Sequence, residues 1–232
     1  MSPHDDAPPF EDALAAMKLR GSVSLVVGNV PPEAYRRVSE QMLGDPSTGV
    51  ERRRLLVVPD AERESALERL RATGRADPSY ARVVTTDGTA RSAVADDDGC
   101  SAPAVDRVDG SLGGVGGAVT DAIARFETVA GGLAPAELRV GVDAFAALNG
   151  GGTETAFGFL HVLGRQVRDA DGMAHVRLAR AYDSRVVRTL EPLCDAVVEL
   201  RLDGYRLEQR WHLREEEIVS DWLPVDTPGG AP

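Results

Sequence analysis

The chain has 232 residues, 43% of them hydrophobic and 27% charged, which fits a single α/β domain with a sizeable core. Its formal net charge of −11 opposes nucleic-acid binding, and no apolar run approaches the roughly 18 residues that cross a bilayer. The first residues lack the basic and apolar regions of a signal peptide, so we expect a soluble, cytoplasmic protein that does not bind membranes.

Lysine is nearly absent from the chain. Of the 26 basic residues, Lys18 is the only lysine. This composition is expected of a cytoplasmic protein from a halophile, because an acidic surface stays soluble where salt screens charges within about 3 Å at 1 M. High-GC codon usage would also replace lysine by arginine, and the composition leaves both explanations open.

The first part of the chain predicts a short helix, a strand and a second helix. We expect disorder over 1–10 and a lead-in helix over 11–19, which together form an N-terminal segment, 1–20. A single domain over 21–225 follows. Residues 22–27 are apolar and β-branched, typical of a strand buried on both faces. Gly28 ends this strand, and a helix runs from Pro32 to about Leu43.

Strands and helices then alternate. Asp60 is a candidate N-cap for a helix over 61–71, which would turn Leu67 and Leu70 inward and Arg69 outward. We expect an acidic surface loop over 87–110 and a disordered tail over 226–232. Other strands are predicted over 53–58, 80–85, 138–142, 173–179, 195–202 and 205–213, with an edge strand over 218–225. Other helices are predicted over 111–129, over 153–168 and in a short segment that ends at Leu190.

This alternation predicts the α/β class, with a doubly wound, mostly parallel sheet and right-handed crossovers. Asp203 and Gly204 form a hairpin signal, so the last strands should run antiparallel.

The junction after the first strand has the outline of a phosphate-binding loop without its chemistry. The P-loop pattern G-x-x-x-x-G-K-[ST] can be laid on Gly28. Its second glycine then falls on Glu33, its lysine on Ala34 and its hydroxyl on Tyr35. Ala34 cannot supply a cation, and Tyr35 is too large for the place of the small hydroxyl on magnesium.

The remaining residues of this loop also oppose phosphate binding. Pro31 and Pro32 have no N–H groups with which to cradle phosphate, and Glu33 adds a negative charge. One like-charge pair about 4 Å apart costs about 4 kcal/mol at an effective dielectric of about 20. An ordinary strand–loop–helix junction accounts for the same residues. A second glycine-rich run, GSLGGVGG (110–117), follows a loop rather than a strand, so we interpret it as the start of a helix.

Asp143 follows the predicted strand over 138–142, at the strand end where open α/β sheets bind ligands. Capping of a helix or loop is the alternative role for this side chain.

The histidines and cysteines show no metal-ligand spacing, and we expect no metal. His161, His175 and His212 fall on predicted helices or strands, where we expect buried, hydrogen-bonded roles. Cys100 and Cys194 are expected to be free thiols.

Two charged runs have plain structural explanations. Residues 96–98 are three consecutive aspartates, typical of a solvated segment. Residues 52–54 are three arginines that lead into a strand, so they do not predict a nucleic-acid surface.

The order of these elements resembles the core of RecA- and KaiC-type P-loop ATPases. In that group the P-loop strand comes first, a later strand ends in an aspartate that holds the magnesium shell, and an antiparallel hairpin follows. Asp143 matches that aspartate. The chain also resembles an uncharacterised haloarchaeal family that is similar to this group and has lost the P-loop (Walker A) motif. The segments that carry the resemblance are LLVV (55–58), ELRVGVDAFAAL (137–148), FLHVLGRQVR (159–168), GMAHVRL (172–178), RTLEPLCDAVVELR (188–201) and EQRWHL (208–213).

The resemblance implies a three-layer RecA/KaiC-like fold with a vestigial nucleotide site. That site would comprise Gly28, Pro31, Pro32, Glu33, Ala34, Tyr35 and Asp143. The active ATPases place a glutamate base after the second strand, where the segment PDAE offers Asp60 or Glu62. We expect no catalytic residue and no cofactor, because the phosphate loop is lost.

We therefore predict a non-catalytic domain, a pseudo-ATPase, that acts in protein interaction or regulation in a halophilic archaeon, with another protein as its partner. The alternative is a nucleotide-binding protein or weak ATPase with a remodelled phosphate loop. A nucleic-acid-associated regulator is a third, less favoured hypothesis. Self-association stays open, because relatives in the active group form rings.

Overall fold

The computed structural model describes residues 10–87, 102–143, 145 and 152–225. The strands in this part of the chain form one ten-stranded sheet in the order β10-β8-β7-β1-β6-β5-β2-β3-β4, with β9 beside β8. The seven strands from β7 to β4 in this order are parallel, and the pairs of β8 with β7, β9 and β10 are antiparallel. The strands are β1 (Ser22–Val27), β2 (Arg53–Pro59), β3 (Ala81–Asp87), β4 (Ala104–Asp109), β5 (Leu138–Val142), β6 (Met173–Leu178), β7 (Ala196–Asp203), β8 (Arg206–Leu213), β9 (Ile218–Val219) and β10 (Leu223–Pro224).

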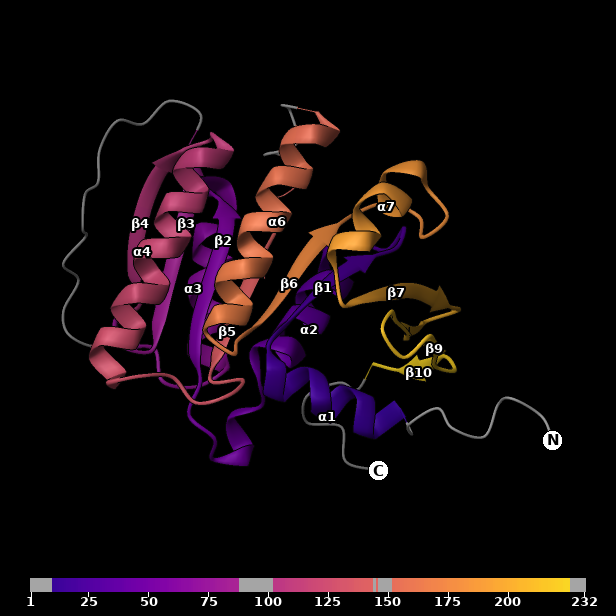
Figure 1. Cartoon of the computed structure of the whole chain (residues 1–232), viewed down its shortest axis with the longest axis horizontal. Helices are drawn as coiled ribbons and strands as arrows, with labels where there is room; N and C mark the ends of the chain where they lie inside the picture. The colour runs from indigo at the N-terminus through magenta and orange to yellow at the C-terminus, as the bar shows by residue number, and fades with distance from the viewer. Residues whose placement is uncertain (1–9, 88–101, 144, 146–151, 226–232) are drawn as a thin grey trace.

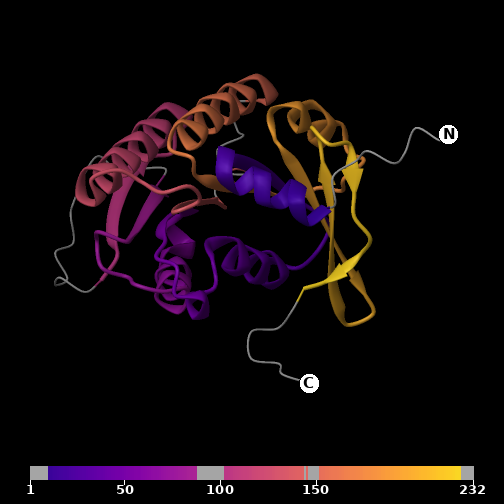
Figure 2. The ribbon, with the colours of Figure 1, turned by 60° about the horizontal axis from the view of Figure 1, so that its bottom comes forward.

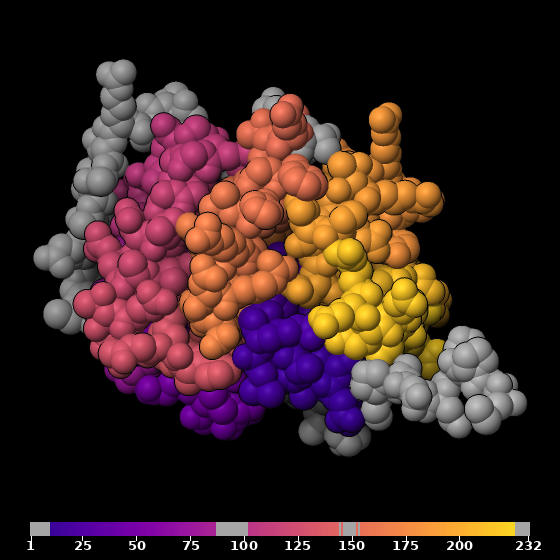
Figure 3. Space-filling model, in the orientation of Figure 1, coloured from indigo at the N-terminus to yellow at the C-terminus, as the bar shows by residue number. Residues whose placement is uncertain are grey.

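Helices cover both faces of this sheet (Figure 1). On one face lie α4 (Leu112–Ala130), α6 (Thr153–Asp169) and α7 (Arg185–Leu190), which pack on the strands in one core. Figure 3 shows these helices side by side on the surface of the molecule. On the other face lie α2 (Pro32–Leu43) and α3 (Arg63–Ala72). The predicted α/β class, the mostly parallel sheet and the C-terminal antiparallel hairpin of β7 and β8 are thus confirmed.

The central strands are mostly apolar because both of their faces are covered. All six residues of β1 are buried. Val23, Leu25 and Val27 belong to the core under α4 and α6, whereas Val26 belongs to the core under α2. This alternation follows from the two-residue repeat of a strand.

The helix α1 (Phe10–Arg20) lies across the amino end of the sheet, between α6 and α2 in the view of Figure 2. Ala13 and Met17 pack against Ala196 of β7 and Leu213 of β8. No helix in the described part of the chain is long and apolar enough to cross a membrane.

Three predicted segments differ from the structure. The edge strand predicted over 218–225 is two short strands, β9 and β10, and residues 220–222 between them are not in a strand. Asp60 does not cap a helix: it begins a 3-10 turn, η2 (Asp60–Glu62), and α3 starts after this turn. Residues 104–109, part of the range 87–110 predicted as an acidic surface loop, form β4. Val105 packs under α3 and Val108 against the opposite core, so two apolar residues are enough to anchor a charged strand. Phe10, the last residue of the range 1–10 predicted to be disordered, begins α1. Residues 1–9, the Asp run at 96–98, Cys100 and the tail over 226–232 lie outside the described residues.

Candidate functional site

Gly28, the residue that ends β1, is required by its contact with β7. Its φ of +143° is a backbone conformation that residues with a side chain rarely adopt. A Cβ atom at this position would overlap the carbonyl oxygen of Leu200. The Gly28 N–H donates to the carbonyl oxygen of Arg180 at 2.8 Å. Packing alone therefore explains this glycine, without a phosphate.

Tyr35 is the residue on which the hydroxyl of the P-loop pattern falls when that pattern is laid on Gly28. The side chain is buried, and its phenol donates to the carbonyl oxygen of Gly28 at 2.5 Å. The guanidinium of Arg177 lies 5.0 Å from the centre of the ring. Burial raises the pKa of Tyr35 to about 12, so the phenol stays protonated. Tyr35 thus ties α2 to the loop that precedes it.

A cleft of about 240 Å³ lies beside this loop, at the carboxyl ends of the parallel strands. The N-terminal end of α2, the turn after β2 and the ends of β5 and β6 all contribute to its lining. Three acidic and three basic side chains line it: Glu33, Glu62, Asp143, Arg36, Arg69 and Arg177. The cleft therefore carries both signs of charge in equal number.

Asp143 is not available to this cleft as a free carboxylate. Its Oδ2 atom accepts a hydrogen bond from Nη2 of Arg69 at 2.6 Å, and the two side chains are only 5% and 4% exposed. Nη1 of Arg69 also donates to the hydroxyl oxygen of Ser39 on α2, at 3.1 Å. The predicted choice between ligand binding and loop capping is thus replaced by a buried ion pair that joins β5 to α3.

His175 of β6 extends this polar network. Its Nε2 atom lies 2.7 Å from the hydroxyl oxygen of Ser39. Burial lowers the pKa of His175 to about 4, against a weaker opposing effect of the nearby Asp143 carboxylate. Gly141 on the neighbouring strand leaves room for the ring, because a Cβ atom there would lie 2.8 Å from Nε2. The predicted buried, hydrogen-bonded role of His175 is confirmed.

The neutral state of His175 predicts a loss of stability in mild acid. Its folded pKa is about 4 and its usual value about 6.5, so between these values the unfolded chain binds more protons. Stability contributed by this residue is therefore complete above pH 6.5 and lost as the pH falls toward 4. We expect about 2 kcal/mol of unfolding free energy to be lost through His175 between pH 7 and pH 5.

This prediction can be tested by urea unfolding at both pH values. His175→Gln keeps a hydrogen-bonding group for Ser39 without a titrating ring, so its loss between the two pH values should be smaller than that of the parent chain by this amount. His161→Gln, which changes an exposed histidine, should behave like the parent chain. Equal losses in His175→Gln and the parent chain would contradict the prediction.

Arg69 was predicted to lie on the outer face of its helix, α3, and that prediction is wrong. Ala66, Arg69, Leu70 and Thr73 are all buried. Their spacing of i, i+3, i+4 and i+7 is the pattern of one helix face. The signal was therefore present in the spacing, but a charged residue on this stripe was assigned to the surface.

The other candidate residues after β2 are placed around the cleft. Glu62 lines it and lies 3.7 Å from Arg177, whereas Asp60 is exposed at the start of η2. Pro31, Pro32 and Glu33 are exposed at the start of α2. The structure thus brings Glu33, Glu62 and Asp143 to one cleft.

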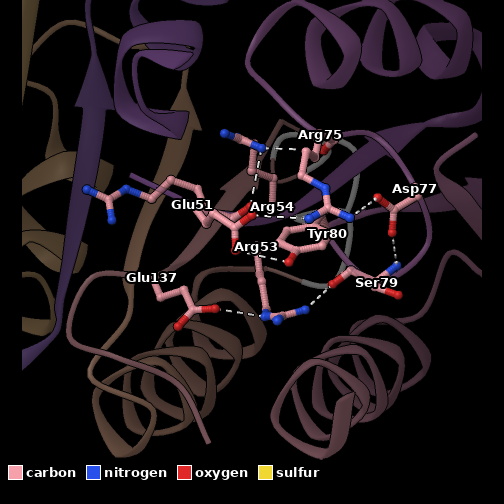
Figure 4. Close-up of polar contacts among 9 residues, drawn as sticks. Glu51, Arg53, Arg54, Arg75, Asp77, Ser79, Tyr80 and Glu137 are labelled. Atoms are coloured by element: carbon pink, nitrogen blue, oxygen red, sulfur yellow. Dashed lines mark hydrogen bonds and ion pairs between the residues drawn. The ribbon is translucent and has the colours of Figure 1, made fainter. Parts of the chain in front are cut away.

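The arginine run at 52–54 belongs to a polar cluster at the opposite end of the sheet (Figure 4). Arg53 is buried, and its Nε atom donates to Glu137 at 2.8 Å. The ring of Tyr80 lies beneath Arg53 and Arg75, at 4.6 and 3.8 Å from their guanidinium carbons. Arg54 is also buried, and it donates to backbone carbonyl groups. These contacts close the amino end of the sheet.

The other histidines differ from one another. His161 is exposed, so its predicted buried role is wrong: its position on α6 faces solvent. His212 is partly buried, lies 3.3 Å from Glu199 and stacks on Tyr182 with ring centres 4.2 Å apart. Cys194 is a buried free thiol, as predicted. No group of metal-binding side chains is found among the described residues.

Comparison with known proteins finds one family. The model of a "Family of unknown function (DUF7504)" matches residues 21–200. No curated protein matches the chain. The family match covers β1 to the middle of β7, and with them the cleft and the buried ion pair. Because this match spans most of its length, the chain belongs to the family of unknown function DUF7504.

Proposed function

We propose that this chain is a non-catalytic RecA/KaiC-like domain that acts in protein interaction or regulation in the cytoplasm of a halophilic archaeon. The observation that carries the proposal is the buried ion pair of Asp143 and Arg69. In the ATPases that the sequence resembles, the matching aspartate holds the magnesium shell. Here the carboxylate at that position is paired with the guanidinium of Arg69.

The energetics of this pair support a structural role. A magnesium ion that took the Oδ2 atom of Asp143 would displace Arg69, and a buried guanidinium without its carboxylate is strongly destabilising. The loop adds a second obstacle, because Tyr35 is hydrogen-bonded to the carbonyl oxygen of Gly28. Two prolines and Glu33 stand where N–H groups would meet phosphate. Several positions of this one site thus lack the groups that phosphate binding requires.

A remodelled nucleotide site is the second candidate. Arg36, Arg69 and Arg177 line the cleft, and arginine forks match phosphate geometry. Glu33 and Glu62 oppose an anion in the same cleft. The cleft therefore has no net positive charge with which to attract a nucleotide, and this supports the non-catalytic proposal.

Calorimetric titration of ATP and magnesium into the protein, in molar potassium chloride, distinguishes the two. We expect no saturable heat up to millimolar nucleotide. Saturable binding that depends on magnesium would contradict the proposal.

Two variants sharpen this test. Glu33→Gln removes the exposed carboxylate at the start of α2, and it would strengthen binding only if nucleotide occupied the cleft. Glu154→Gln is its matched control, because Glu154 occupies the first turn of α6 on the other face of the sheet. Equal titrations for the two variants, without heat, are the result that the proposal requires.

A further inference from the structure

A second cavity, away from the cleft, lies where α1 and the C-terminal end of α2 meet the sheet. Its volume is about 200 Å³. Leu14, Met42, Met173 and Trp211 give it apolar walls. An apolar cavity of about 150 Å³ is known to hold benzene. The space is therefore large enough for a small organic molecule.

The charges around this cavity have one sign. Lys18 of α1 and Arg139 of β5 line it, and its lining contains no carboxylate among the described residues. This contrasts with a chain that has 37 acidic residues and a net charge of −11. Such a lining favours an anion over a cation or a neutral molecule.

Arg139 is the central feature of this lining. The residue is 8% exposed, and its guanidinium donates to the carbonyl oxygens of Ala136 and Met42 and to the sulfur of Met173. All three acceptors are neutral. No carboxylate among the described residues pairs with Arg139. A buried arginine with neutral partners gains from a nearby anion, because charge-assisted pairs are the stronger ones.

The environment of Arg139 also favours a bound anion. Burial is the main reason why the pKa of Arg139 falls to about 10, and the positive charges of Arg52 and Arg54 lower it further. The side chain nevertheless remains charged at neutral pH. A bound carboxylate would offset both the burial and the repulsion.

We propose that this cavity binds a small carboxylate with an apolar body, a medium-chain or aryl-alkyl carboxylate. Arg139 receives the carboxylate, and Lys18 adds a second positive charge to the site. The apolar body lies against Trp211 and the two methionines. This cavity is separate from the cleft in which a nucleotide would bind, because it lies at the other end of the strands.

Octanoate is a suitable probe, because its chain and head group match the size and polarity of the cavity. Trp211 lines the cavity and is one of two tryptophans. In a Trp222→Phe background its fluorescence therefore reports on the site alone. We expect octanoate to change this fluorescence saturably in the submillimolar range, and octan-1-ol, which lacks the charge, to bind at least tenfold more weakly.

Variants test the role of Lys18 and the place where the probe binds. Lys18→Gln changes an exposed side chain, so it should fold normally and weaken octanoate severalfold without changing the affinity for octanol. Leu14→Phe should fill the cavity without adding a second tryptophan, and it should abolish the fluorescence changes caused by octanoate and by octanol. Arg165→Gln, an exposed arginine of α6, is the control for loss of one positive charge and should bind octanoate like the parent chain.

Two outcomes would overturn the proposal. One is equal affinity for octanoate and octanol, which would show a merely apolar cavity. The other is an unchanged Trp211 signal with octanoate. Neither outcome depends on whether ATP binds at the cleft. The octanoate experiment therefore tests this site independently of the proposed function.

Discussion

Asp143→Ala should lower the free energy of unfolding by about 3–5 kcal/mol, because it leaves Arg69 charged and buried without its carboxylate. The Nη2 atom of Arg69 lies 2.6 Å from Oδ2 of Asp143, and both side chains are almost fully buried. Chemical unfolding monitored by circular dichroism measures this loss. The loss should persist in molar potassium chloride, since salt screens buried pairs much less than exposed ones.

A second ion pair serves as the control. Arg165 and Asp169 are 80% and 70% exposed on α6, with a distance of 3.6 Å between Nε and Oδ2. Asp169→Ala should cost about 0.5 kcal/mol or less, as is usual for exposed pairs. The double variant Arg69→Met, Asp143→Leu should recover most of the stability lost in Asp143→Ala, because no unpaired charge remains. A small loss in Asp143→Ala, similar to that of Asp169→Ala, would show that Arg69 does not depend on its pairing with Asp143, and would remove the main support for the proposed function.

Gly28→Ala should also be strongly destabilising, by about 3 kcal/mol or more. A φ of +143° is almost confined to glycine, and such strain costs about 1–3 kcal/mol. The added methyl group would in addition overlap the carbonyl oxygen of Leu200, and forced overpacking costs about 1–3 kcal/mol. Thermal and urea unfolding of Gly28→Ala measure the combined loss of stability from both causes.

Gly204→Ala separates the two contributions to this loss. Gly204, in the hairpin between β7 and β8, has a φ of +60° and open space around the position of a Cβ atom. It should therefore lose only about 1–2 kcal/mol, from the left-handed backbone alone. If Gly28→Ala were no worse than Gly204→Ala, the contact with β7 would not explain why β1 ends in glycine.

The strands could be predicted from the sequence because their signal is local. The β-branched runs at 22–27 and 138–142 match β1 and β5, since both faces of these strands are covered. β4 was not predicted, because Val105 and Val108 are separated by charged residues and each packs on a different face. A strand held by two apolar contacts has almost no hydrophobic pattern from which it could be predicted.

The site could be predicted only in part. The position of Asp143 at a strand end follows from the chain order, but its partner Arg69 lies 74 residues away in sequence. The reason for Gly28 is likewise distant, since Leu200 belongs to the last parallel strand. Such pairings depend on how the strands are arranged in the sheet, which residue spacing does not reveal. The helical stripe that contains Arg69 could be recognised from the sequence. The burial of Arg69 could be explained only from the structure, which shows its partner, the buried carboxylate of Asp143.

The two edges of the sheet limit how another molecule can attach to the protein. On one side β4 carries Asp106, Arg107 and Asp109, and the Asp106 carboxylate is paired with Arg82 at 2.7 Å. On the other side β9 and β10 have two residues each, and Pro224 in β10 has no N–H to donate. Charged, very short or proline-containing edges resist pairing with a foreign strand. Attachment by β-augmentation is therefore disfavoured at both margins, and recognition would have to use side chains on the helical faces or in the cavities.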